Sequence, residues 1–175
     1  RWIALRGPRE NFAKQTKYGL EITPGLNSVA DRKPISALFY RQQHRDFSTE
    51  GDVDYIPKSS HDLAGIVCLQ SETFYYSFGI TQIDSEFYLV LEKMADQHST
   101  VLAKQKLKNT KGLTLRVDSK NDTYQVSFKE SGETYTPVGK PLSGDILSTD
   151  VAGGFTGALI GLYATSANHI ELKNK

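Results

Sequence analysis

The chain has 175 residues, 38% of them hydrophobic and 23% charged, with 21 Lys and Arg against 20 Asp and Glu. This length and composition suit one folded domain and exclude a disordered chain. The net charge of +1 gives no electrostatic basis for binding nucleic acid or an anionic membrane. No apolar run reaches the roughly 20 residues that span a bilayer, and no signal peptide is visible. We therefore expect neither nucleic acid nor a membrane as a partner. Because the chain starts at Arg1, we also expect a piece of a longer protein.

Apolar and polar side chains alternate with a period of two along most of the chain, which is typical of half-buried strands. Clusters of Asn, Asp, Ser and Gly separate the alternating runs and predict tight turns. The strands predicted in this way are Phe47–Tyr55, Phe74–Ile80, Phe87–Leu91, Leu113–Val117, Tyr124–Phe128 and Ala158–Ala164.

No stretch reads as a long amphipathic helix. Met94–Lys108 lacks a clean apolar face, so we interpret it as a loop that leads into a strand at Val101–Lys106. No repeat or linker marks a second domain, and residues 1–175 are predicted to form a single all-β, antiparallel two-sheet β-sandwich. Three segments fit neither strand nor simple turn, and long loops on a rigid β scaffold often carry function. They are Asn27–Pro34, Pro57–Leu63 and Ser143–Gly157.

Metal-based and nucleophilic chemistry find little support in the sequence. The four histidines are far apart, and no pair has the spacing of a zinc site. Cys68 is the only cysteine and lies in the apolar run Gly65–Leu69, which favours a buried core thiol over a nucleophile. Neither a Gly-x-Ser-x-Gly elbow nor a phosphate-binding glycine loop is present. We expect no cofactor, and metal binding stays open.

Three acidic residues form the sharpest catalytic candidate. Glu50, Asp52 and Asp54 alternate along the strand predicted for Phe47–Tyr55, which places their carboxylates on one face at intervals of roughly 6.5–7 Å. Carboxyl pairs at about 6.5–9.5 Å suit inverting glycoside hydrolysis. The opposite face of the same strand is apolar, however, so we favour the interpretation that these acids point to water.

Aromatic residues are the other candidates for a functional role, because sugars bind against flat aromatic rings. Phe155 is unusual, since it stands among residues with almost no side chain in Ala152–Gly157. The residues alone allow either a tucked loop anchor or a prong that enters a partner's pocket. Packing between strands is the favoured role for any one of the other aromatic candidates, which are Trp2, Tyr40, Tyr55, Tyr75, Tyr88, Tyr135 and Tyr163.

Four segments, in this order along the chain, carry a family resemblance. They are Trp2–Arg9 (WIALRGPR), Arg41–Glu50 (RQQHRDFSTE), Ala64–Gln70 (AGIVCLQ) and Leu147–Ala164, which contains the Gly-Gly-Phe-Thr-Gly run at 153–157. Together they resemble the C-terminal domain of family 43 glycoside hydrolases of the β-xylosidase type. The resemblance runs from Trp2 to about Ala164. After it, Ser166–Leu172 departs from the strand with which relatives usually finish.

The resemblance implies a concanavalin A-like jelly roll that packs on a catalytic five-bladed propeller. The propeller would carry the acid, the base and the pKa-tuning carboxylate, so this chain would be a non-catalytic accessory domain of a β-xylosidase or α-arabinofuranosidase. In the family, a sandwich loop brings a phenylalanine to the substrate-binding cleft. By motif this implies a pocket-closing loop made of Gly153, Gly154, Phe155 and Thr156. Similar modules bind xylan, so the partners implied are the propeller and xylan or xylo-oligosaccharide.

A polar cluster around Arg41 leaves two roles open. Arg41, His44 and Arg45, with Trp2 nearby in the domain's opening motif, could contact carbohydrate or the propeller. Alternatively, the cluster could be an ion-paired strand edge, because dense charged residues rarely stay unpaired when buried. We favour an interface or structural role. Two further functions remain as alternatives: an independent xylan-binding module and an autonomous lectin-fold glycanase that uses Glu50, Asp52 and Asp54.

Overall fold

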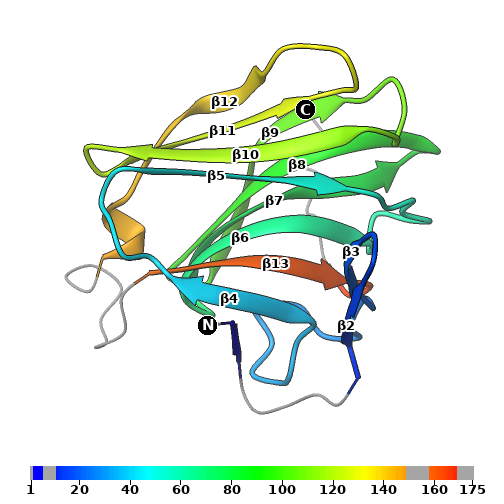
Figure 1. The fold of residues 1–175 in the computed structure, drawn as a ribbon. Helices are drawn as coiled ribbons and strands as arrows, with labels where there is room; N and C mark the ends of the chain where they lie inside the picture. Colours follow the sequence, from blue (N-terminus) through cyan, green and yellow to red (C-terminus); the bar gives the residue numbers. More distant parts are fainter. Residues whose placement is uncertain (1, 6–10, 149–157, 169–175) are drawn as a thin grey trace.

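The computed structural model describes residues 2–5, 11–148 and 158–168. Two antiparallel sheets lie face to face, and a small separate hairpin covers one end of the sandwich (Figure 1). The prediction of an all-β, two-sheet antiparallel sandwich is confirmed. Within the described ranges, no helix is long and apolar enough to cross a bilayer.

The larger sheet has seven strands, and neighbours in its order are hydrogen-bonded. In that order they are β1 (Ile3–Ala4), β4 (Ala37–Arg41), β13 (Leu159–Thr165), β6 (Leu63–Ser71), β7 (Phe74–Ile83), β8 (Glu86–Ala95) and β9 (His98–Lys106).

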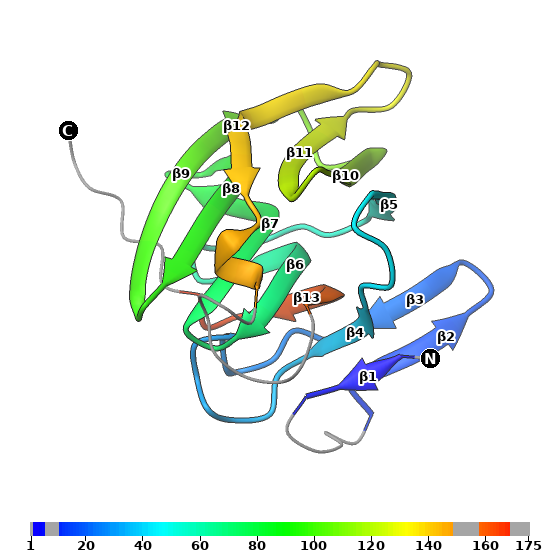
Figure 2. The same cartoon turned by 90° about the vertical axis from the view of Figure 1, so that its left-hand side faces the viewer.

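The smaller sheet has four strands and faces the larger one. In order they are β12 (Thr136–Ser143), β11 (Thr123–Lys129), β10 (Leu113–Lys120) and β5 (Phe47–Val53). The hairpin consists of β2 (Ala13–Thr16) and β3 (Gly19–Ile22). A single turn of 3₁₀ helix, η1 (Asp145–Leu147), lies between the two layers at one end of the sandwich (Figure 2).

The main core fills the space between the two sheets, and alternation along each strand supplies it. Strand β5 shows the pattern clearly, because Phe47, Thr49 and Val53 are partly buried while Ser48, Glu50 and Asp52 are exposed. Residues from the facing strands complete the core, among them Phe78, Leu89, Leu91, Leu113, Leu115 and Val117. The two faces predicted for this strand are therefore confirmed.

A second apolar cluster covers the outer face of the larger sheet. The segment between β3 and β4 folds over it and contributes Val29 and Ile35, each 1% exposed. The backbone N–H of Val29 donates to the hydroxyl of Tyr163 at 2.9 Å. Tyr75 and Tyr163 belong to this cluster and are buried, so the packing role favoured for these two aromatic candidates is confirmed.

Some strands escaped the sequence pattern for identifiable reasons. Strand β12 carries Pro137 and Pro141, which a strand tolerates at the edge of a sheet, where β12 lies. The strand predicted at Val101–Lys106 is confirmed as part of β9, but the loop predicted before it is instead the end of β8, a tight turn and the start of β9. The turn residues, Asp96 and Gln97, both have positive φ, although neither is glycine. Strands β1, β4 and the β2–β3 hairpin were too short to give a clear alternation.

Strand β13 fits between β4 and β6 because Gly161 has no side chain. A Cβ atom at this position would lie 2.7 Å from Cε1 of Phe39 and 2.8 Å from the carbonyl oxygen of Leu38. Phe39 is fully buried and cannot move aside without opening the outer apolar cluster. The glycine that interrupts the apolar run Ala158–Ala164 therefore sets how closely these strands approach.

We expect Gly161→Ala to lower the free energy of unfolding by about 1–3 kcal/mol, the usual cost of overpacking. Gly51→Ala is the matched control, because a Cβ atom there meets nothing within 4 Å and Gly51 needs no positive φ. Urea denaturation of both variants measures the difference. Equal stability of Gly161→Ala and the unmodified chain would contradict the close packing.

The single cysteine gives a second test of the core. Cys68 is 5% exposed and packs between the sheets, and burial raises its pKa to about 12. We expect the folded chain at pH 8 to react negligibly with Ellman's reagent, because the reactive thiolate is scarce and shielded. When the same chain is unfolded in concentrated urea, its single thiol should react with one equivalent of the reagent. Fast labelling of the folded chain would refute burial of this thiol.

Candidate functional site

One end of the sandwich gathers the polar cluster predicted around Arg41. The connection from β4 to β5, the turn between β10 and β11, η1 and the start of β13 all meet there (Figure 2). These segments are far apart in sequence and are brought together by the two sheets. Buried Ile146 and Leu147 fix η1, and the hydroxyl of Tyr76 donates to the carbonyl of Ser143 at 2.7 Å.

Gln42 ties this end together. Its backbone N–H donates to the carbonyl of Ala158 at 3.0 Å, which holds the start of β13 beside the end of β4. Its side-chain amide donates to the carbonyl of His44 at 2.9 Å, and its amide oxygen accepts from the hydroxyl of Tyr124 at 2.6 Å. The side chain of Gln42 is thus engaged on both sides and acts as a bridge between the two sheets.

Arg45, in the connection from β4 to β5, forms an ion pair with Asp122, in the turn between β10 and β11. Nε of Arg45 donates to Oδ1 of Asp122 at 3.2 Å, and a second guanidinium nitrogen contacts Oδ2. This bidentate pairing holds the pKa of Asp122 below its usual range and raises that of Arg45. Asp46 accepts the backbone N–H of Asn121 at 3.0 Å. Arg45 is therefore ion-paired with the β10–β11 turn, and Asp46 accepts a backbone hydrogen bond from the same turn.

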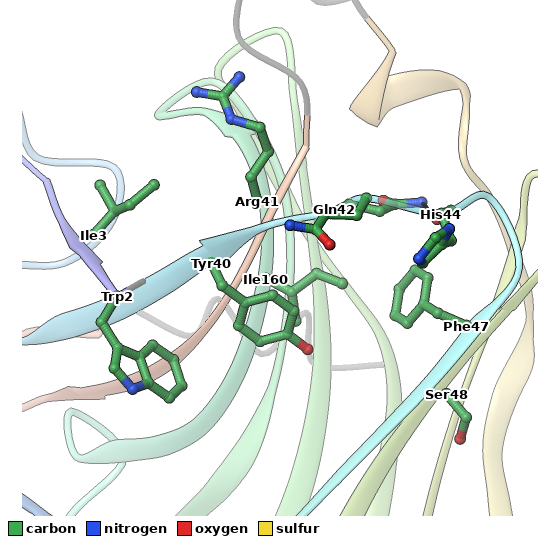
Figure 3. A pocket seen from close by; sticks show the side chains of 10 residues that line it. Trp2, Ile3, Tyr40, Arg41, Gln42, His44, Phe47, Ser48 and Ile160 are labelled. Carbon is green, nitrogen blue, oxygen red and sulfur yellow. Dashed lines mark hydrogen bonds between the residues drawn. The ribbon is translucent and has the colours of Figure 1, made fainter.

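A pocket of about 540 Å³ opens beside this cluster, between β4 and β5, and we call it the Trp2 pocket. The rings of Trp2, Tyr40 and Phe47 lie on one side of β4, and the guanidinium of Arg41 points to the other side (Figure 3). Trp2 and Tyr40 form an edge-to-face pair, with centroids 5.8 Å apart and planes at 76°. The lining is completed by Ile3, Arg41, Gln42, Gln43, His44, Ser48 and Ile160.

A second pocket of about 270 Å³ lies on the other side of Gln42, and we call it the Arg45 pocket. Its lining shares Gln42, Gln43 and His44 with the Trp2 pocket. It also includes Ser148 and Ala158, the described residues that flank 149–157 on either side. The predicted pocket-closing residues Gly153, Gly154, Phe155 and Thr156 lie outside the described residues, so their role stays a prediction.

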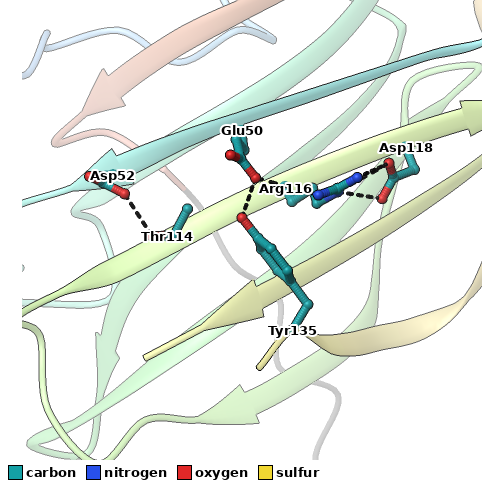
Figure 4. Close-up of polar contacts among 6 residues, drawn as sticks. All are labelled: Glu50, Asp52, Thr114, Arg116, Asp118 and Tyr135. Carbon is teal, nitrogen blue, oxygen red and sulfur yellow. Dashed lines mark hydrogen bonds and ion pairs between the residues drawn. The ribbon is translucent and has the colours of Figure 1, made fainter. Parts of the chain in front are cut away.

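The acidic residues of β5 lie elsewhere, on the outer face of the smaller sheet (Figure 4). Glu50 accepts from the hydroxyl of Tyr135 and lies 3.5 Å from a guanidinium nitrogen of Arg116. The hydroxyl of Thr114 donates to Asp52 at 2.6 Å. Both carboxylates therefore accept hydrogen bonds within a flat, exposed polar network.

Arg116 is the centre of that network. It donates to both carboxylate oxygens of Asp118 at 2.9–3.1 Å, and its guanidinium lies 5.1 Å from the ring centroid of Tyr135. Burial opposes ionisation of Asp118, but hydrogen bonds from Arg116 and Ser48 lower its pKa overall. Arg116 thus binds acids on both sides, which is how a solvated sheet face balances its charges.

The other sequence candidates are dispersed. In the described part of the chain, no three of the His, Cys, Asp and Glu side chains are grouped so as to hold a metal ion. Of the aromatic candidates, Trp2 is half exposed, and Tyr40, Tyr55, Tyr88 and Tyr135 are partly buried. Of these, the structure brings only Trp2 and Tyr40 together in one described pocket.

Two residues of this end, Asp122 and Tyr124, could not be identified as site residues from the sequence. Each contacts the Arg41–Arg45 segment across 77 to 82 residues of sequence. Tyr124 was placed in a strand and Asp122 in a turn, but no local signal indicates which distant residues they meet.

Comparison with known proteins agrees with the fold. A solved GH43_12 protein retrieved from capybara gut metagenome is 38% identical, with a TM-score of 0.86 over 94% of this chain and 32% of that chain. A non-reducing-end α-L-arabinofuranosidase from Bacteroides ovatus is 26% identical over 94% of this chain and 31% of its own length. A xylan β-1,4-xylosidase from Bacillus halodurans is 20% identical, with a TM-score of 0.76 over 82% of this chain and 29% of that chain.

The chain therefore spans about a third of the length of these relatives. The family model described as "Beta xylosidase C-terminal Concanavalin A-like domain" matches residues 1–173. The chain thus belongs to the family of C-terminal concanavalin A-like domains of family 43 glycoside hydrolases.

Proposed function

We propose that this chain is the non-catalytic accessory domain, residues 1–175, of a longer family 43 β-xylosidase or α-L-arabinofuranosidase. In this proposal it packs on the catalytic propeller and helps to shape the substrate pocket. The observation that carries the proposal is the family match over nearly the whole chain, combined with coverage of about a third of each relative. The remaining two thirds of such enzymes would hold the hydrolytic residues.

The geometry at the Arg45 pocket supports this assignment. The segment 149–157 departs from Ser148 and returns at Ala158, and both ends are tightly held. Ser148 donates its backbone N–H to the carbonyl of Asp145 at 3.0 Å, and the carbonyl of Ala158 accepts from Gln42. Flanking residues that are fixed on a rigid sandwich suit the positioning of one apolar side chain, Phe155, against a partner.

Phe155 would wall off one end of the propeller's pocket. An apolar wall excludes water and limits the depth of the site, which favours release of single sugars from chain ends. Arg41, His44 and Gln43 would lie at the rim of this contact, where exposed polar side chains supply orientation rather than most of the affinity.

The acidic face of β5 argues against an autonomous glycanase. A hydrolytic pair needs one carboxylic acid that donates a proton and a second carboxylate beside the bound sugar. Glu50 and Asp52 instead accept hydrogen bonds from Tyr135 and Thr114 on an exposed sheet face. An independent xylan-binding module remains the second candidate, and the aromatic lining of the Trp2 pocket favours it.

In the full-length enzyme we expect Phe155→Ala to lower kcat/KM for nitrophenyl xyloside or arabinofuranoside by about tenfold or more, the effect of losing an apolar contact to the substrate. Steady-state kinetics measures this loss. Phe155→Leu, which keeps an apolar side chain, should retain much of the kcat/KM that Phe155→Ala loses. The melting temperature of each variant controls for folding. Unchanged kinetics for Phe155→Ala would remove the pocket-closing role.

The Glu50→Gln/Asp52→Asn double variant should leave the activity unchanged. We expect its kcat/KM in the full-length enzyme to stay within about twofold of the parent value, because neither carboxylate would touch the substrate. The isolated 175-residue chain should likewise give no hydrolysis above the buffer rate. A large loss of activity in the double variant, at unchanged stability, would restore the glycanase alternative.

A further inference from the structure

We propose that Glu92 and residues 166–168, which follow β13, form a latch on the outer face of the larger sheet that acid closes. We call residues 166–168 the strap. Glu92 is neutral in the closed latch, and loss of its proton releases the strap. The inference does not depend on the proposed function, because it concerns contacts within this chain.

Backbone hydrogen bonds hold the strap at both of its ends. The N–H of Ser166 donates to the carbonyl of Gly25 at 2.8 Å. The N–H of Asn168 donates to the carbonyl of His61 at 2.9 Å, and Nδ1 of His61 lies 3.1 Å from the carbonyl oxygen of Asn168. These contacts join the end of β13 to the segments that precede β4 and β6. The strap therefore secures the strand that completes the larger sheet.

Glu92 of β8 places a carboxyl group under this cover. In the sheet it stands beside Ser77, which in turn stands beside Val67 of the outer apolar cluster. Glu92 is 3% exposed, and its Oε1 accepts from the hydroxyl of Ser99 at 2.8 Å. Its Oε2 and Nδ2 of Asn168 are both buried, and neither completes a hydrogen bond. The Asn168 amide is nevertheless close enough to the carboxyl to act on its pKa.

Among the described residues, no cation balances a charge on Glu92. Burial raises the pKa of Glu92, and it outweighs the opposing effects of Ser99 and Asn168, which are both uncharged. A buried carboxylate without a cation is costly, so the group keeps its proton. A half-turn of the Asn168 amide exchanges its oxygen and nitrogen, and the protonated Oε2 would then donate to that oxygen.

Other titratable groups face this site from the neighbouring segments. Tyr75 of β7 and Tyr163 of β13 interact with the charge of Glu92, and burial raises the pKa of both hydroxyls. Both tyrosines therefore stay protonated at neutral pH. Asp31, between β3 and β4, lies near the two tyrosines, and His61 contacts the strap. Asp31 and His61 are both retained when Glu92 alone is replaced, so a substitution of Glu92 separates its contribution from theirs.

Rising pH should open the latch. In the open form Glu92 is exposed and ionises near the ordinary pKa of about 4.3. The closed form keeps its proton to a higher pH, so opening releases a proton in the interval between the two pKa values. In this interval the equilibrium constant for opening rises by up to about tenfold for each pH unit, and above it the constant levels off.

Hydrogen exchange of the Ser166 and Asn168 amides, followed by NMR in the 175-residue chain from about pH 4.5 to about pH 8, tests the latch. Protection factors are compared, because they remove the intrinsic pH dependence of exchange. We expect the protection of both amides to fall at least about tenfold across this range. In Glu92→Gln, which has an uncharged side chain of nearly the same shape, the protection should stay at the value that the unmodified chain shows in acid.

Glu86→Gln is the matched control. Glu86 lies on the same strand, but its side chain is 48% exposed and pairs with Lys106 at 2.8 Å. The protection of the strap in this variant should follow the pH profile of the unmodified chain. Urea unfolding confirms that each variant is folded.

Three outcomes would overturn the proposal. Protection that stays constant with pH in the unmodified chain would remove the switch. An equal pH dependence in Glu92→Gln would assign the effect to Asp31 or His61. Protection that is lost at every pH in Glu92→Gln would make Glu92 a fixed anchor of the strap.

Discussion

The insertion of β13 between β4 and β6 is the constraint on which the rest of this domain depends. The last described strand pairs along its length with two strands from the first half of the chain. This pairing buries Gly161 against Phe39 and brings the Tyr163 hydroxyl to Val29, 134 residues away. It also places Ala158 beside Gln42, so the same strand that completes the sheet fixes one end of the segment 149–157. Such long-range pairing has a high cost in loop-closure entropy, which the burial of both faces of the sheet must offset.

Burial on both faces explains why the larger sheet looks different from the smaller one. Strand β6 is buried at eight of its nine positions, because one face meets the main core and the other meets the segment between β3 and β4. Its sequence is consequently a nearly continuous apolar run, whereas β5 alternates. Polar groups under this cover are costly. Glu92 is 3% exposed, and burial raises its pKa, although the hydroxyl of Ser99 donates to it at 2.8 Å. The outer face of the larger sheet is therefore a second core over β4, β13, β6 and β7.

The limits of prediction from this sequence follow from the same physics. The alternating pattern located β5, β7, β8, β10, β11 and β13. The period of two is clearest in β5, where one face is partly buried and the other is exposed. The pattern could not reveal β12, because its two prolines are typical of loops. It also could not reveal the turn at Asp96 and Gln97, because these residues adopt positive φ although neither is glycine. At the site, the polar cluster was visible as a run in sequence, but its partners Asp122 and Tyr124 were not. Local patterns specify which face of a strand is buried, whereas contacts between distant segments depend on strand order and register.

In the described part of the chain, the exposed acids of β5 and the half-exposed ring of Trp2 lie on different surfaces. Glycoside hydrolysis needs a carboxyl pair and a sugar-binding surface within one site. Here the exposed acids of β5 lie on the outer face of the smaller sheet, engaged with Arg116, Tyr135 and Thr114. Half-exposed Trp2 instead lines a pocket between β4 and β5, and no acid stands among the described residues of its lining. Under the proposed function, the sandwich would shape a neighbouring pocket, and the carboxylates that cleave the glycosidic bond would come from the propeller.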